Sequence, residues 1–105
     1  MKMVMVVLTK NIDSYTIYYY QGKDYEAEIL CYFDNKNVGA IRFFNDHGAI
    51  PKPSVASSGG GFVYLNFPIQ RFGDIVDILR HDKPLSIQVE DQNWGVLRLF
   101  DVPLS

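Results

Sequence analysis

The chain has 105 residues, a formal net charge of −2 and one cysteine, and 14% of its residues are aromatic. This length predicts a single domain over residues 1–105, and one cysteine excludes an internal disulfide framework. The slight negative charge disfavours binding to nucleic acid or to an anionic membrane, because both select surfaces rich in lysine and arginine.

The chain begins with an apolar run, Met1–Leu8. The run is shorter than the roughly 20 residues that span a bilayer, and it is not followed by the small-residue cleavage site of a signal peptide. We therefore expect a first strand or an ordered arm in this part of the chain. Together with the unpaired cysteine, this predicts a cytoplasmic protein with no membrane partner.

Three strands are predicted next, because apolar and polar residues alternate over Ser14–Gln21, Tyr25–Phe33 and Val38–Asn45. Polar turn residues separate the three segments, so we expect an antiparallel meander. Residues 46–61 contain two prolines and four glycines and show no hydrophobic period, which predicts a long exposed loop. A fourth strand, Phe62–Phe67, follows this loop.

The stretch after Pro68 has the only helical period in the chain. Its apolar residues fall at i, i+3, i+4 and i+7, namely at Phe72, Ile75, Val76 and Leu79. We expect a helix that begins near Gln70 and ends before Pro84, which cannot continue it. Leu85–Glu90 and Trp94–Phe100 then form a hairpin. The predicted fold is α+β: an antiparallel sheet of five to seven strands, in the order β-β-β-β-α-β-β, with one helix packed on one face.

The predicted sheet has two different faces. One face is aliphatic and suits a core beneath the helix; it includes Cys31, which then behaves as a small hydrophobe. The other face is aromatic with interspersed charges, and its candidate interface residues are Tyr18, Tyr20, Tyr32, Arg42, Phe44, Phe62, Tyr64, Trp94, Arg98 and Phe100. On the helix, Ile78 lies beside Arg71 outside the core stripe, so both are further candidate contacts.

An exposed aromatic face of this kind usually marks an interface, and a two-fold homodimer is the commonest way to cover one. We therefore predict a non-enzymatic binding or accessory module that dimerises through this face. Three alternatives stay open. The sheet could curl and bury part of the face on itself. The face could bind single-stranded nucleic acid by stacking, although Glu26 and Glu28 weigh against this. Residues 46–61 could also form the lid of a small-ligand binder or enzyme. The identity of a protein or small-molecule partner is not indicated.

Candidate catalytic and metal-binding residues are weak. Cys31 on the inward face is a poor nucleophile, because a buried thiol is inert. Two adjacent pairs, Asp46–His47 and His81–Asp82, lack the spacing of metal ligands. The glycine-rich Ser57–Gly61 lacks the Lys-Ser/Thr ending of a phosphate-binding loop and precedes a strand instead of a helix. We predict no catalytic residue, no metal and no cofactor.

Around the helix, the sequence has Phe67-Pro68, then Phe72, then Ile75-Val76-Asp77-Ile78-Leu79-Arg80 and Lys83-Pro84. In these residues it resembles a group of small bacterial proteins of about a hundred residues, mostly uncharacterised. The resemblance covers most of the chain, and it implies a bacterial protein of the kind carried on mobile elements such as integron gene cassettes. It brings no activity and no catalytic residue. Members with a Gly-Glu-Pro-Val-Gly-like tail differ from this chain, which ends in Phe100–Ser105.

Overall fold

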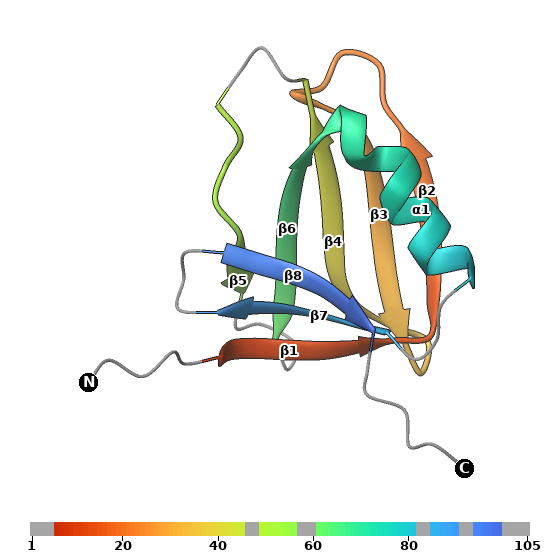
Figure 1. Ribbon diagram of the computed structural model, residues 1–105, viewed down its shortest axis with the longest axis vertical. Helices are drawn as coiled ribbons and strands as arrows, with labels where there is room; N and C mark the ends of the chain where they lie inside the picture. Colours follow the sequence, from red (N-terminus) through yellow and green to blue (C-terminus); the bar gives the residue numbers. More distant parts are fainter. Residues whose placement is uncertain (1–5, 46–48, 57–60, 82–84, 91–93, 100–105) are drawn as a thin grey trace.

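The protein has an α+β fold, and its described residues form two sheets and one α-helix (Figure 1). The computed structural model describes residues 6–45, 49–56, 61–81, 85–90 and 94–99. The α+β class predicted from the sequence is confirmed, but the single antiparallel sheet is not. Five strands form one sheet and three strands form another.

The large sheet has the strand order β2-β3-β4-β6-β5. Its strands are β2 (Ser14–Tyr19), β3 (Tyr25–Phe33), β4 (Lys36–Phe44), β5 (Ser54–Ala56) and β6 (Phe62–Pro68). The first three form the predicted antiparallel meander. At the β3–β4 turn, Asp34 and Asn35 have φ angles of 54° and 66°. Two residues of positive φ form the tight turn whose twist matches the paired strands.

The large sheet is mixed, because β4 and β6 run parallel, with Ile41 opposite Leu65. Two parallel neighbours require the chain between them to return along the sheet. Strand β5 lies on this return and pairs antiparallel with the far edge of β6 (Figure 1). The segment predicted as a loop over residues 46–61 therefore contains a short strand. Residues 46–48 and 57–60 of that segment lie outside the described residues.

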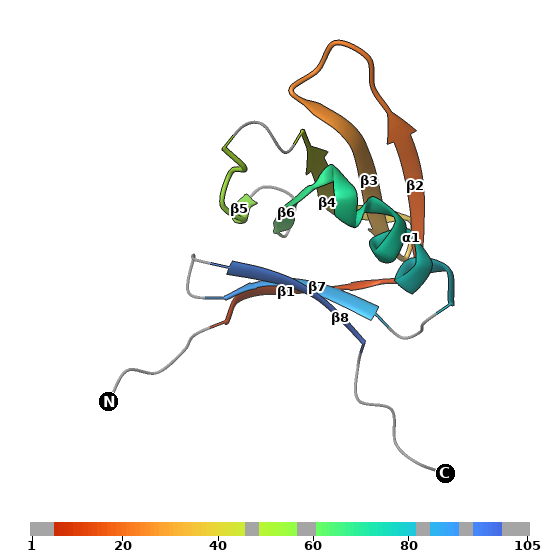
Figure 2. The ribbon, with the colours of Figure 1, turned by 45° about the horizontal axis from the view of Figure 1, so that its top comes forward.

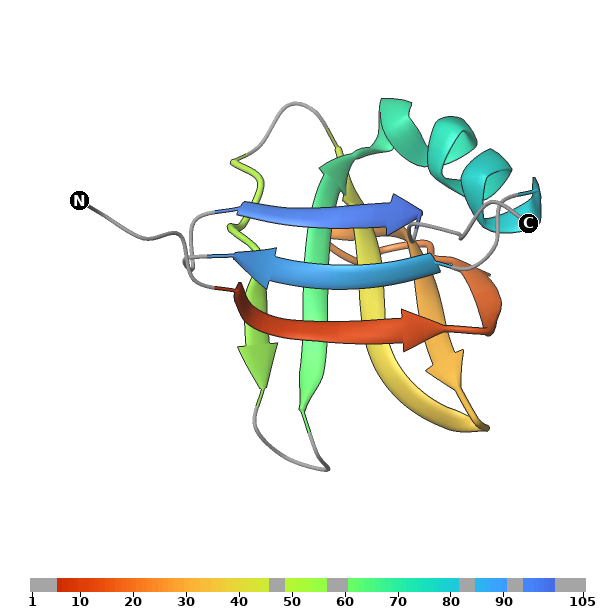
Figure 3. The same cartoon turned by 60° about the horizontal axis from the view of Figure 1, so that its bottom comes forward.

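The small sheet corrects a second expectation. It consists of β1 (Val6–Ile12), β7 (Leu85–Glu90) and β8 (Trp94–Leu99), in the antiparallel order β1-β7-β8. The predicted C-terminal hairpin is present, but it pairs with β1 instead of extending the large sheet. The three strands run across the large sheet, and β1 contacts β3, β4 and β6 (Figure 3). The predicted N-terminal strand is confirmed from Val6 onward.

The single helix lies on the same side of the large sheet as the small sheet (Figure 2). A 3-10 turn, Ile69–Arg71, leads into α1 (Phe72–His81), close to the predicted start. Ile75 and Leu79 are the buried residues of α1, and the Phe72 ring meets the Phe43 ring with centroids 5.0 Å apart. The helix and the small sheet thus share one face of the large sheet.

The core lies between these layers and is aliphatic, as the sequence predicted. Its fully buried large side chains include Ile29, Ile41, Phe43, Val63, Leu65, Ile87 and Val89. Gly39 allows the two sheets to approach closely. A Cβ atom at Gly39 would meet the Ile87 side chain and would lie 2.7 Å from the Val63 carbonyl oxygen.

Candidate functional site

The outer face of the large sheet is the most unusual surface of the molecule. Among the described residues, no helix or strand covers it, because α1 and the small sheet both lie on the inner side (Figure 2). We call this surface the aromatic face, and define it by Tyr18, Tyr20, Tyr25, Glu28, Leu30, Tyr32, Arg42, Phe44, Phe62 and Tyr64. Tyr18 is 41% exposed, and the other aromatic residues of the face are partly exposed.

Several of these rings touch one another across the strands. The rings of Tyr18, in β2, and Tyr20, just after β2, stack with centroids 6.2 Å apart. Tyr25 of β3 meets Tyr20 at 5.4 Å and Phe44 at 5.6 Å, both edge to face. On β6, the Phe62 and Tyr64 centroids are 4.7 Å apart. Pairs of this geometry contribute about 0.5–1.5 kcal/mol beyond their buried area, so the rings hold each other in place.

A charged pair lies in the middle of the aromatic face. Arg42 Nε donates to Glu28 Oε2 at 2.9 Å, and the Tyr20 hydroxyl donates to Glu28 Oε1 at 2.7 Å. The Arg42 guanidinium lies 4.8 Å from the ring centroids of both Tyr25 and Tyr64, within the range of a cation–π interaction. Glu28 is only 6% exposed. Both charges are thus satisfied within the face.

The electrostatics of this cluster follow from the same contacts. The hydrogen bond to Glu28, with a contribution from burial, raises the pKa of Tyr20 to about 12. Tyr20 therefore stays a neutral donor over the physiological range. Lys23, in the β2–β3 turn, places its ammonium 4.4 Å from the Tyr20 centroid. Among the described residues, two cations therefore lie over rings of the aromatic face. Arg42 is paired with the Glu28 carboxylate, and Lys23 lies at the edge of the face.

Tyr25 was missed by the sequence reasoning. Strict alternation along β3 places Tyr25 on the same side as Ala27, which is buried in the core. The register between β3 and β4 shifts between Tyr25 and Ala27. An extra residue of this kind re-aims the next side chain, so Tyr25 turns outward to contact Arg42 and Phe44. No composition signal marks a bulge at this position.

The structure separates the other predicted interface residues from this face. Trp94 and Arg98 belong to β8 of the small sheet, so their backbone is not part of the aromatic face. Their side chains, and the whole of Phe100, lie outside the described residues. Ile78 packs against the core from α1. Arg71 is exposed on the inner side of the large sheet and lies 3.9 Å from Asp74.

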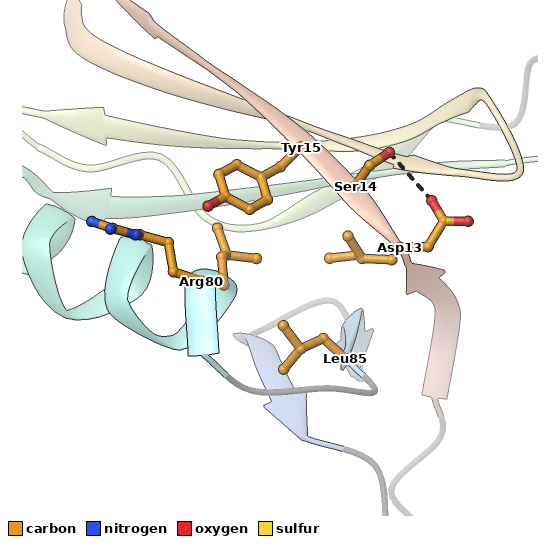
Figure 4. Close-up of a pocket in the computed structure, with 7 residues that line it drawn as sticks. Asp13, Ser14, Tyr15, Arg80 and Leu85 are labelled. Carbon is orange, nitrogen blue, oxygen red and sulfur yellow. Dashed lines mark hydrogen bonds between the residues drawn. The ribbon is translucent and has the colours of Figure 1, made fainter.

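Two surface cavities lie away from the aromatic face. One has a volume of about 340 Å³ and is formed by the β1–β2 corner, the end of α1 and the start of β7 (Figure 4). The other, of about 450 Å³, lies between β1 and the β3–β4 turn. Of the described residues in the expected lid, 46–61, only Gly61 lines either cavity.

The described residues offer little catalytic chemistry. Burial raises the pKa of the Cys31 thiol to about 12, so it stays protonated. His81 lies 3.4 Å from Asp77 on the exposed side of α1; His47 lies outside the described residues. Within the described ranges, no three acidic, histidine or cysteine side chains are grouped to hold a metal. In the same ranges, no helix has the length and apolar character needed to cross a membrane.

Comparison with known proteins gives no match: no protein-family model fits the chain, and neither a curated protein nor a solved structure is significantly similar to it. The resemblance to small bacterial proteins therefore stays a prediction.

Proposed function

We propose that the chain is a non-enzymatic binding module that forms a two-fold homodimer through its aromatic face. The observation that carries this proposal is the pairing of Glu28 with Arg42 inside one chain. A surface whose central charges already neutralise each other needs no oppositely charged partner. It can meet an identical copy of itself, which is what a two-fold interface requires.

The size of the face supports the same proposal. Strands lie about 4.8 Å apart and rise about 3.3 Å per residue, so the four strands β2, β3, β4 and β6, of about eight residues each, form a face of roughly 19 by 26 Å. Two such faces packed together cover roughly 1,000 Å², close to the lower limit for a stable biological interface. We therefore expect a reversible dimer whose dissociation constant lies in the micromolar range.

The face is less suited to single-stranded nucleic acid. Such a surface needs free cations that follow the phosphates and open rings on which bases stack. Arg42 is bound to Glu28, and Tyr25 and Tyr64 lie against the guanidinium. A phosphate at Arg42 would have to compete with a nearly buried carboxylate. Fluorescence titration with an oligonucleotide at two salt concentrations should show no salt-sensitive binding.

Sedimentation velocity over micromolar to submillimolar concentrations tests the homodimer. The wild-type chain should shift from 12.0 kDa towards twice this mass. Tyr18→Glu should remain monomeric, because it places a charge at the most exposed ring of the face. Tyr19→Glu is the matched control: Tyr19 is 73% exposed but points to the other side of β2, where its ring meets Phe72. A wild-type monomer at every concentration, or equal dimerisation by both variants, would refute the proposal.

A further inference from the structure

The cavity of about 340 Å³ lies where distant parts of the chain meet (Figure 4). It is lined by Ile12, Asp13, Ser14, Tyr15, Leu79, Arg80 and Leu85. Tyr15 faces the inner side of the large sheet. Leu79 and Arg80 belong to α1, and Ile12 and Leu85 belong to β1 and β7 of the small sheet. The cavity is therefore separate from the aromatic face. Its volume lies at the lower end of the range of about 300–1,000 Å³ for small-molecule sites.

The interior of the cavity is aliphatic. Ile12, Leu79 and Leu85 line it and belong to the buried core, with exposures of 8%, 3% and 3%. The partly exposed Tyr15 ring forms a side wall (Figure 4). An apolar group that enters this space gains about fourfold in affinity for each methylene removed from water. The interior therefore favours an alkyl or branched hydrocarbon group.

One end of the cavity carries two hydrogen-bond donors, the Arg80 guanidinium and the Tyr15 hydroxyl. Within the described residues, neither the Arg80 guanidinium nor the Tyr15 hydroxyl forms a hydrogen bond or ion pair. Figure 4 shows the hydroxyl end of Tyr15 pointing towards the Arg80 side chain. A guanidinium binds a carboxylate through two parallel hydrogen bonds, and a phenol can donate a third.

Asp13, the acidic residue among the described residues of the lining, lies at the opposite end. Asp13 Oδ1 accepts a hydrogen bond from Ser14 Oγ at 3.3 Å, and Asp13 Oδ2 accepts from the Asp34 backbone N–H at 2.9 Å. In Figure 4 its carboxylate is directed away from Tyr15 and Leu85. Both oxygens are thus engaged with neighbours, and the end beside Arg80 is positive.

We propose that this cavity binds a small aliphatic monocarboxylate. Its carboxylate pairs with Arg80 and accepts a hydrogen bond from Tyr15, and its hydrocarbon body occupies the interior between β1, α1 and β7. The proposal does not depend on dimerisation, because no residue of the aromatic face lines the cavity.

Titration with hexanoate, followed by the methyl NMR signals of Ile12, Leu79 and Leu85, tests the proposal. Hexanoate should shift these signals saturably. Hexanol, with a tail of the same length and no charge, and hexylamine, with the opposite charge, should bind at least tenfold more weakly. Arg80→Gln should weaken hexanoate binding at least tenfold, and Tyr15→Phe a few-fold. Arg71→Gln, which removes an exposed arginine just before α1 and outside the cavity, should leave binding unchanged.

Three results would overturn the proposal. The first is the absence of saturable shifts at the three methyl-bearing residues. The second is hexanol or hexylamine binding as tightly as hexanoate. The third is an Arg80→Gln variant, folded by circular dichroism, that binds hexanoate as tightly as the wild type.

Discussion

The two faces of the large sheet are built from the same strands and have opposite chemistry. On β3 and β4 the inward positions, such as Ile29, Ile41 and Phe43, are fully buried by the small sheet and α1. The outward positions between them, Glu28 and Arg42, form an ion pair among aromatic rings. The inner face finds its cover within its own chain. Among the described residues, nothing covers the outer face, yet the charges of Glu28 and Arg42 neutralise each other there.

The comparison is tested most strongly by two adjacent phenylalanines. Phe43 points inward, is fully buried and contacts the rings of Phe67 and Phe72. Phe44 is partly exposed on the aromatic face. Phe43→Ala should reduce the free energy of unfolding by about 4 kcal/mol, and Phe44→Ala by about 1–2 kcal/mol. Urea unfolding at low protein concentration measures both; equal losses would contradict the assignment of the two faces.

The central pair of the aromatic face gives the next largest effect. Glu28→Ala removes the acceptor of both Arg42 and Tyr20 and should cost about 2 kcal/mol, because hydrogen bonds to charged groups contribute about 1.5–3 kcal/mol and Arg42 is partly solvated. Glu28→Gln keeps one acceptor oxygen and should cost about half as much. If the midpoint of urea unfolding is the same for Glu28→Ala as for the wild type, the ion pair does not stabilise the aromatic face.

The effect that is smallest at neutral pH concerns Cys31 on the inner face, because it appears only at alkaline pH. Burial raises the pKa of its thiol to about 12, above the roughly 8.5 of an unfolded cysteine. Between these values the folded chain holds a proton that the unfolded chain releases, so stability falls as pH rises. The slope should be at most about 1.4 kcal/mol per pH unit. Cys31→Ala should show a shallower fall between pH 9 and 11; an unchanged slope would mean that the thiol is accessible.

The sequence predicted the elements and the inner face because their signals are local. The helical spacing of Phe72, Ile75, Val76 and Leu79 identified α1, and strict alternation on β3, β4 and β6 identified the core positions. Alternation states which side of a strand is buried, but not which strand lies beside it. The C-terminal hairpin was therefore assigned to the wrong sheet, and Trp94 and Arg98 were grouped with residues of the large sheet.

The candidate sites were predicted less well, because they depend on contacts between distant residues. The seven rings and the ion pair come from β2, β3, β4, β6 and, for Tyr20, the residue just after β2. The bulge that turns Tyr25 outward leaves no mark in the sequence. Glu28 was predicted on the outer face, among the aromatic residues, and it lies there, but the sequence did not indicate that Tyr20 and Arg42 donate hydrogen bonds to its two carboxylate oxygens. Arg80 and Tyr15 are 65 residues apart in the sequence, and only the meeting of α1 with β2 places them on one cavity.

The central claim is that the aromatic face is buried against a second copy of the chain. An isotope-filtered NOE experiment on a mixture of labelled and unlabelled chains tests it directly. The account predicts intermolecular contacts at the rings of Tyr18, Phe62 and Tyr64 and none at α1. Intermolecular contacts confined to the small sheet or to α1, or none at a concentration where the chain sediments as a dimer, would contradict it.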